Sequence, residues 1–257
     1  MIGGWTQNAS VDKLGVTQYN AHENDAPAHR EKGIAMTYGS TIGMKFYPDG
    51  AVREFKGNTV VADVIPGSEA FCAMQQLRQM VIDAGLNSHL ILLPEDSYHM
   101  TYISGLNDQQ RIDDFWPDAL SREATMDQAD DYATAAIEKA QIPGPARMRF
   151  VDVGWGKGCC LIRLAPADEE QHKILFGFRE RAADALGVRR PNHEKYRFHI
   201  TLGYTRIVAE GETELQRKTL VEKMNAFLAT QPEFWTDKPY MAYFDDMHVF
   251  SPHRLPR

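Results

Sequence analysis

The chain has 257 residues, of which 43% are hydrophobic and 25% charged, and its formal net charge is −7. These proportions predict a globular fold with a full core, and no apolar run approaches the ~18 to 20 residues of a membrane-spanning helix. The acidic balance weighs against a protein that mainly binds long nucleic acid, because such proteins present basic surfaces to the phosphates. A small phosphorylated substrate is still possible, because the local field in a cleft matters more than the total charge.

The N-terminus and the cysteines indicate a cytoplasmic protein. Residues 1–6 lack the basic region and the apolar stretch of a secretory signal. Three cysteines, two of them adjacent, do not form a disulfide framework. The sequence has no Cys-x-x-Cys, His-x-His or His-Glu-x-x-His pattern. We therefore expect neither a metal nor another cofactor.

In chain order, a polar arm at residues 1–30 precedes a region with strand character. Pro48-Asp49-Gly50 separates the strand-like runs 42–47 and 51–55, and this triplet favours a turn. No linker rich in glycine or serine divides the rest of the chain. Residues 31–257 are therefore predicted to form a single domain with two lobes.

Periodicity predicts the elements of that domain. A helix over 68–84 is expected to end at Gly85, and a helix over 168–186 at Gly187. The glycines at 154–158 favour a hairpin turn over a phosphate loop, because the Gly-Lys-Ser/Thr ending is missing. The other expected elements are strands at 59–65, 147–153, 158–165 and 243–251, a helical insert at 106–141, and a helix at 212–229.

The same triplet, His-x-Thr, occurs twice, one hundred positions apart, in His99-Met100-Thr101 and His199-Ile200-Thr201. The context matches at the same offset, because Pro66 and Pro166 each follow an apolar strand-like run and precede a helical pattern. Strand, helix and His-x-Thr strand thus occur twice, in a first repeat at 59–103 and a second at 158–204. We interpret this order as an ancient duplication.

Each triplet places an imidazole and a hydroxyl on one face of a strand, because successive side chains of a strand alternate. Two imidazoles that face one cleft suit concerted general acid–base catalysis. Two threonine hydroxyls can donate hydrogen bonds to the non-bridging oxygens of a phosphate. Cleavage of a phosphodiester requires these functions, since one oxygen loses a proton and another gains one. No Gly-x-Ser-x-Gly motif supports a serine hydrolase.

The sequences His99-Met100-Thr101-Tyr102 and His199-Ile200-Thr201-Leu202 resemble the paired signatures of the 2H phosphoesterase superfamily, which includes RNA 2′-5′ ligase-like proteins and 2′,3′-cyclic nucleotide phosphodiesterases. The wider chain, from about residue 33 to 251, is similar to a bacterial and fungal branch of it. The resemblance implies an α+β, bilobed fold with antiparallel sheets, a pseudo-two-fold axis and a central cleft. It also implies metal-independent action on a 2′,3′-cyclic phosphate or a related phosphodiester.

The resemblance assigns His99 and His199 as the acid–base pair, with a slight preference for His199 as the base, and Thr101 and Thr201 as phosphate donors. Further candidates for substrate binding are Arg197, which shares a strand face with His199, and two loop aromatics that could stack on a base, Tyr38 and Trp155. By alternation, Tyr204 is expected in the core unless the strand bulges, and His193, which precedes the strand, is expected on the surface.

The leading hypothesis is a phosphodiesterase for nucleotides or short RNA ends that carry a cyclic phosphate. One alternative is a ligase or transferase that acts on RNA ends with the same residues. Another is a non-catalytic module that binds nucleotide or RNA. The expected partner is a small phosphorylated substrate, with no long nucleic acid and no membrane. The sequence leaves the oligomeric state open.

Overall fold

The computed structural model describes residues 9–11, 17–19 and 36–254. Most of the arm predicted at 1–30 lies outside the described residues. Its described parts are β1 (Ala9–Val11) and β2 (Thr17–Tyr19), which pair as a two-stranded antiparallel sheet. Among the described residues, no helix is both long and apolar enough to cross a membrane.

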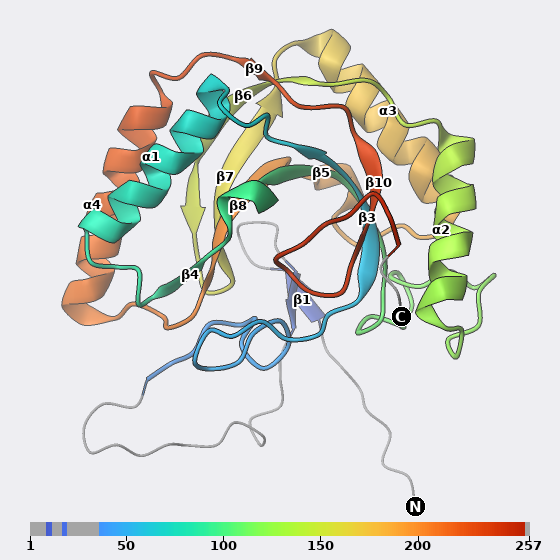
Figure 1. The fold of residues 1–257 in the computed structure, drawn as a ribbon, viewed down its shortest axis with the longest axis horizontal. Coiled ribbons are helices and arrows are strands. Elements are labelled where there is room, and N and C mark those ends of the chain that lie inside the picture. The colour runs from blue at the N-terminus through green and yellow to red at the C-terminus, as the bar shows by residue number, and fades with distance from the viewer. Residues whose placement is uncertain (1–8, 12–16, 20–35, 255–257) are drawn as a thin grey trace, which may run out of the picture.

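A single antiparallel sheet of eight strands runs through both halves of the chain (Figure 1). The strands follow the order β10-β3-β5-β8-β7-β6-β9, and β4 pairs with β8 beside this path. The strands are β3 (Gly57–Asp63), β4 (Leu90–Leu92), β5 (His99–Asn107), β6 (Arg147–Trp155), β7 (Cys159–Pro166), β8 (His199–Thr205), β9 (Phe234–Trp235) and β10 (Tyr240–Phe244). The predicted α+β class with antiparallel pairing is confirmed.

The helices lie in two pairs beside the sheet. In Figure 1, α1 (Glu69–Asp83) and α4 (Gly211–Leu228) lie next to each other on one side, and α2 (Met126–Ala140) and α3 (Glu169–Leu186) on the other. Short 3₁₀ segments, η1 (Glu95–Ser97) and η2 (His193–Lys195), precede β5 and β8.

The helix ends follow the expected signals. The Ser68 side chain accepts a hydrogen bond from the backbone of Phe71 at 3.2 Å, and Asp168 caps α3 by accepting from Gln171 at 2.9 Å. Gly187 ends α3 with a φ of +66°, a value that favours glycine. Caps at positions 68 and 168 thus start the two helices of the repeat.

The duplication is visible in the strand register. Val61 lies opposite Thr101 and Leu161 opposite Thr201; Asp63 lies opposite His99 and Arg163 opposite His199. Every pair in β7 and β8 is therefore the β3 and β5 pair displaced by one hundred residues. Shared register is stronger evidence for a duplication than a shared motif, because it fixes which side chains meet.

Both motif strands also carry the same bulge. In β5 the register skips Tyr102, and in β8 it skips Leu202. The two strands pair with each other at Met100 and Ile200. When equivalent residues lie opposite each other in an antiparallel pair, a two-fold rotation relates their strands. The pair Met100–Ile200 therefore marks the pseudo-two-fold axis.

Three regions differ from the prediction. The strand expected at 243–251 is wrong, because β10 ends at Phe244, Asp246 then accepts a hydrogen bond from the His248 backbone in a turn, and only an isolated bridge joins Tyr243 to Ser251. The runs 42–47 and 51–55 form a compact loop with isolated bridges at Phe46, although the turn at 48–50 is present and Asp49 accepts from the Ala51 backbone at 2.9 Å. Of the insert predicted as helical at 106–141, only α2 is α-helical, and turns occupy most of 108–125. Asp114, with a φ of +66°, and the proline at 117 are incompatible with a continuous helix there.

Candidate active site

The side chains of both motifs line one cavity of about 280 Å³, although one hundred residues separate them in sequence. β5 and β8 are neighbours in the sheet, so the faces with His99 and Thr101 and with His199 and Thr201 open onto the same space. The prediction that the motifs meet in a central cleft agrees with this arrangement.

The two imidazoles are held in the same way. Nδ1 of His99 lies 2.8 Å from the backbone oxygen of Ser97, and Nδ1 of His199 lies 2.8 Å from that of Arg197. A carbonyl oxygen only accepts hydrogen bonds, so Nδ1 carries the proton in each bond. In the neutral rings Nε2 is therefore the atom that can accept a proton.

Burial lowers the pKa of both histidines. Desolvation takes the pKa of His99 to about 4, and the charge on His199 acts in the same direction. Burial also lowers the pKa of His199, helped by the positive charges of Lys45 and Arg179. In the free protein at neutral pH both rings are neutral, and a bound anion would raise both pKa values.

The two threonines leave their hydroxyls available to a ligand. Thr101 and Thr201 are half-buried on the cavity wall. In the described part of the chain, no group forms a hydrogen bond with either hydroxyl. Each hydroxyl can therefore donate to an oxygen placed between the two histidines.

Lys45 is a cavity residue that sequence reasoning missed. Its ammonium group lies 3.4 Å from the hydroxyl of Tyr204 and 4.9 Å from the ring centroids of both Tyr204 and Phe55. Burial, together with the charge of Arg190, lowers the pKa of Lys45 to about 8. Lys45 belongs to the loop before the first repeat, so neither the motif nor the duplication pointed to it.

Tyr204 lines the cavity, so the prediction from simple alternation that it lies in the core is wrong. The bulge at Leu202 shifts the alternation of β8, so Tyr204 turns to the cavity side with His199 and Thr201. Its equivalent in the first repeat, Ser104, lines the cavity as well.

The cavity lining is positively charged. Lys45, Arg179 and Arg190 line it, and no aspartate or glutamate occurs among its described lining residues. The whole chain carries −7, so this cavity departs from the charge of the protein around it. Such a cavity favours an anionic ligand.

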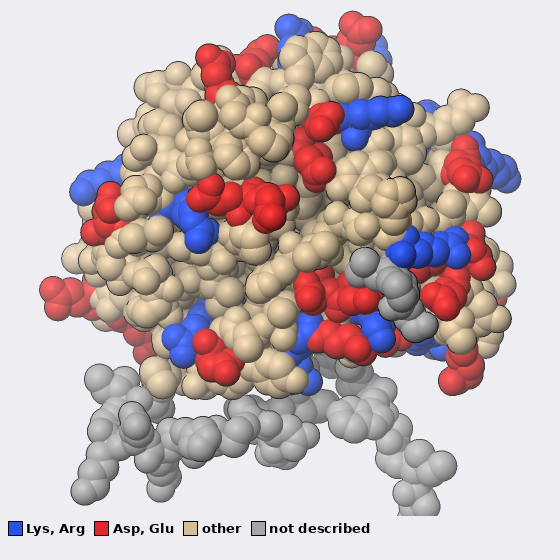
Figure 2. Space-filling view, viewed as in Figure 1, with Lys and Arg blue, Asp and Glu red and all other residues tan. Residues whose placement is uncertain are grey.

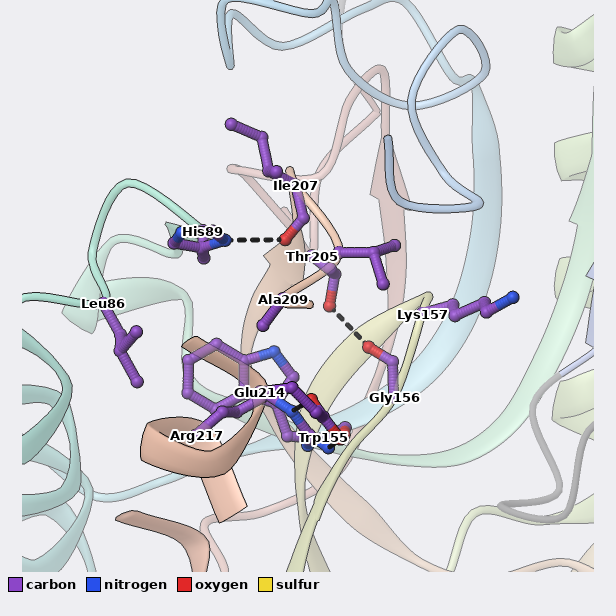
Figure 3. Close-up of a pocket in the computed structure, with 11 residues that line it drawn as sticks. Leu86, His89, Trp155, Gly156, Lys157, Thr205, Ile207, Ala209, Glu214 and Arg217 are labelled. Carbon is purple, nitrogen blue, oxygen red and sulfur yellow. Dashed lines mark hydrogen bonds and ion pairs between the residues drawn. The ribbon is translucent and has the colours of Figure 1, made fainter. Parts of the chain in front are cut away.

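The three additional substrate-binding candidates lie outside this cavity. Arg197 precedes the first residue of β8, and its side chain is exposed. Tyr38 is half-buried and bridges to Ile207. Trp155 is 5% exposed and lines a separate, smaller pocket with His89 and Arg217 (Figure 3). The structure thus brings none of the three side chains into the cavity that the motif residues line.

His193 differs from the expected surface residue. It is 5% exposed, lines the cavity, and places Nε2 2.8 Å from a carboxylate oxygen of Glu180. Burial and the charge of Arg179 lower its pKa.

In the described residues, no group of three or more histidine, cysteine, aspartate or glutamate side chains is arranged to hold a metal ion.

Comparisons with known proteins find similarity to one family model and to several solved structures. A family model, described as 2H-phosphodiest, a domain of unknown function (DUF1868), matches residues 45–157. The crystal structure of the conserved protein of unknown function ATU0111 from Agrobacterium tumefaciens is 27% identical; the match covers 83% of this chain and 91% of that one, with a TM-score of 0.75. No curated protein matches the chain significantly.

More distant structural matches include TT0787 of Thermus thermophilus and LigT of Escherichia coli in apo form. TT0787 is 15% identical, covers 73% of this chain and 85% of its own, and has a TM-score of 0.41. LigT is 13% identical, covers 79% of this chain and 96% of its own, and has a TM-score of 0.40. The family match includes the first His-x-Thr motif. Residues 45–157 are therefore similar to the domain that the 2H-phosphodiest model describes, and the fold is that of the structure from Agrobacterium tumefaciens.

Proposed function

We propose that this chain is a phosphodiesterase that hydrolyses a 2′,3′-cyclic phosphate on a nucleotide or a short RNA end, without a metal. The observation that carries the proposal is the pair of His-x-Thr motifs that face one cationic cavity, each with its histidine Nε2 directed away from the carbonyl that holds Nδ1. The family match supports phosphoesterase chemistry in general.

In the proposed reaction, water attacks phosphorus, and one of the two bonds from phosphorus to the ribose oxygens breaks. One imidazole takes a proton from the water through Nε2, and the other gives a proton to the departing ribose oxygen. The product is a phosphomonoester with a free hydroxyl beside it. No covalent intermediate with the protein is required.

The negative charge that develops on the non-bridging oxygens is stabilised by Thr101, Thr201 and Lys45. The threonine hydroxyls donate hydrogen bonds, and the ammonium of Lys45 supplies a charge close to His199. The bound phosphate raises the pKa of both imidazoles, which lets one of them hold the proton needed by the leaving group.

A small substrate fits the surface better than a long nucleic acid does. On the face in Figure 2, acidic and basic side chains are intermixed, and the described residues drawn there form no broad basic patch. A short RNA end can reach the cavity without such a patch. The ligase or transferase reaction on RNA ends uses the same residues in reverse and is the second candidate for this cavity.

A substrate with an activated leaving group tests whether one histidine acts as the general acid and the other as the general base. A nucleotide p-nitrophenyl phosphodiester releases an oxygen that needs no proton, so loss of the general acid should matter little. With this substrate, one of the variants His99→Ala and His199→Ala should recover to within about tenfold of the wild-type kcat, and the other should stay about 10² to 10⁴ lower. Recovery of both variants, or of neither, would contradict the proposed roles.

A non-catalytic binding module predicts a different result for the same variants. Each substitution would change affinity for a cyclic nucleotide, and no variant or wild type would release product. Calorimetric binding measured beside turnover separates these outcomes.

A further inference from the structure

The cavity extends farther beyond the motif on β5 than beyond the motif on β8. On β8 its lining ends at Tyr204, whereas on the β5 side it continues to Asn107. We call this extension the distal subsite, lined by Gly105, Asn107, Gln110, Val188, Arg190 and Asn192. Gly105 lies four positions after Thr101, which corresponds to at most roughly 13 Å along an extended strand.

The distal subsite exists because the two repeats differ at one place. In one half, β4 pairs with the end of β8, where Leu90 lies opposite Thr205. In the other half, the equivalent positions are Arg190, one hundred residues after Leu90, and Gly105, one hundred residues before Thr205, and here the guanidinium of Arg190 donates to the Gly105 carbonyl at 2.8 Å. The Arg190 side chain thus bonds to the strand edge that, in the other half, pairs with the backbone of β4. The space that β4 fills with aliphatic residues in one half remains part of the cavity in the other.

The chemistry of this space suits a second anion. Arg190 also donates to Gln110 at 3.3 Å and lies over the ring of Phe115, at 5.0 Å from its centroid. Arg179, only 3% exposed, donates to the carbonyls of Tyr102 and His193. The guanidinium of Arg179 also lies over the ring of Tyr196, at 3.7 Å from its centroid, so it is fixed beside the cavity as a second positive charge.

We propose that the distal subsite binds a second phosphate of the substrate, attached to the 5′ side of the nucleoside whose cyclic phosphate lies between the histidines. Arg190 supplies the main charge, and Gln110, from the insert between the repeats, helps to orient it. The preferred substrate class is therefore a nucleoside 2′,3′-cyclic phosphate that also carries a 5′-phosphate or 5′-diphosphate. This proposal rests on the proposed function and specifies its substrate.

The test compares kcat/KM for a nucleoside 2′,3′-cyclic phosphate with that for its 5′-phosphate and 5′-diphosphate derivatives. In the wild type, at least one derivative should be preferred about tenfold or more, the range of a charge-assisted hydrogen bond. In Arg190→Gln this preference should fall towards one, and in Arg190→Lys it should be partly kept. A ratio of two substrates cancels any general loss caused by altered folding.

Arg149→Gln is the matched control, because Arg149 is exposed on β6, outside the cavity lining, and its loss changes the charge equally. The control should keep the wild-type preference. Equal kcat/KM for all three substrates, or a preference that survives in Arg190→Gln, would overturn the distal subsite while leaving the phosphodiesterase intact.

Binding separates failure of the subsite from failure of the proposed function. Calorimetry with a nucleoside 3′,5′-bisphosphate and the matching 3′-monophosphate requires no turnover. Tighter binding of the bisphosphate, lost in Arg190→Gln, supports the subsite even if no cyclic phosphate is hydrolysed, a result that would reject the proposed function alone. Equal affinity of both ligands would reject the subsite.

Discussion

At the residue scale, the two histidines share one environment. Each ring is fixed through Nδ1 by the carbonyl two residues before it, at 2.8 Å, and each pKa is lowered by burial. A base must be neutral and an acid protonated before the reaction starts. The free protein therefore needs conditions in which one ring is protonated despite its depressed pKa.

This requirement predicts the pH dependence. Since the pKa of His99 is about 4 and that of His199 lies below its usual 6.5, kcat/KM should be bell-shaped with its maximum below pH 6.5. A bound phosphate raises both pKa values, so the maximum of kcat should lie at higher pH. Initial rates between pH 4 and 9 provide both profiles. A maximum of kcat/KM above pH 7, or a flat profile between pH 5 and 8, would contradict the account.

Lys45 provides a second prediction at this scale. Its pKa is lowered from 10.5 to about 8, so the unfolded chain binds this proton more tightly, and below pH 8 the charged form costs stability in the fold. Lys45→Met should therefore raise the free energy of unfolding at pH 7 by roughly 1–2 kcal/mol. It should also raise KM for a cyclic nucleotide about tenfold, because an attractive charge is lost.

The stability difference between wild type and Lys45→Met should shrink as pH rises from 8 towards 10.5, where the folded wild type gives up the proton. Urea unfolding at several pH values measures it. Lys173→Met is the control, since Lys173 is exposed on α3 and should change neither property. A destabilised Lys45→Met with unchanged KM would mean that Lys45 serves only the fold.

At the element scale, the bulges in β5 and β8 decide which side chains reach the cavity. Gly203, directly after the bulge at Leu202, lies against β4, and a Cβ added there would lie 2.5 Å from the backbone oxygen of Ile91. A backbone atom cannot move aside as a side chain does. β8 depends on this close approach to hold His199 and Tyr204 in place.

Gly203→Ala should therefore destabilise the fold by roughly 2–3 kcal/mol and lower kcat/KM, because it separates β4 from β8. Urea unfolding and steady-state rates measure the two effects. Gly144→Ala is the control, because a Cβ at Gly144 meets nothing within 4 Å. Wild-type stability in Gly203→Ala would show that β4 is not needed at the edge of β8.

The strand–helix–strand repeat could be predicted from the sequence because its signals are local. Strand alternation, the caps before Glu69 and Glu169, and the two triplets each depend on a few neighbouring residues. Tyr204 could not be placed, because a bulge depends on the partner strand. Residues 42–55 have strand composition but no neighbouring strand along their length, so they fold as a loop.

The residues around the motifs were the least predictable part of the site. Lys45 comes from outside the repeats, and Arg190 acts where the repeats differ, so the duplication gave no signal for either. Arg197 shares the alternation of β8 in sequence, but the strand begins only at His199, and the side chain is exposed. The two triplets alone predict the acid–base and phosphate-binding groups, whereas the other residues of the cavity depend on the three-dimensional fold.

At the scale of the whole molecule, an acidic chain with a net charge of −7 encloses a cavity lined by three cations and no carboxylate among its described lining residues. The cavity attracts a small anion, whereas the surface around it repels a long one. The attraction acts on an anion inside the cavity, at short range. The repulsion acts between exposed charges, and salt screens it beyond about 10 Å.

A longer RNA should therefore give no increase in kcat/KM. We expect kcat/KM for a ten-nucleotide RNA that ends in a 2′,3′-cyclic phosphate to be no higher than for the corresponding mononucleotide, at both 50 and 200 mM salt. A value that rises with length and falls steeply with salt would indicate an extended nucleic-acid surface.

The central claim is that two histidines from duplicated strands together hydrolyse a cyclic phosphodiester. Hydrolysis of a panel of 2′,3′-cyclic nucleotides, with EDTA present, by the wild type, His99→Ala and His199→Ala tests it most directly. We predict wild-type turnover that survives EDTA and falls by about 10² to 10⁴ in each variant. Activity that EDTA abolishes, or that persists in either variant, would contradict the two-histidine mechanism, and an inactive wild type would exclude these nucleotides as substrates.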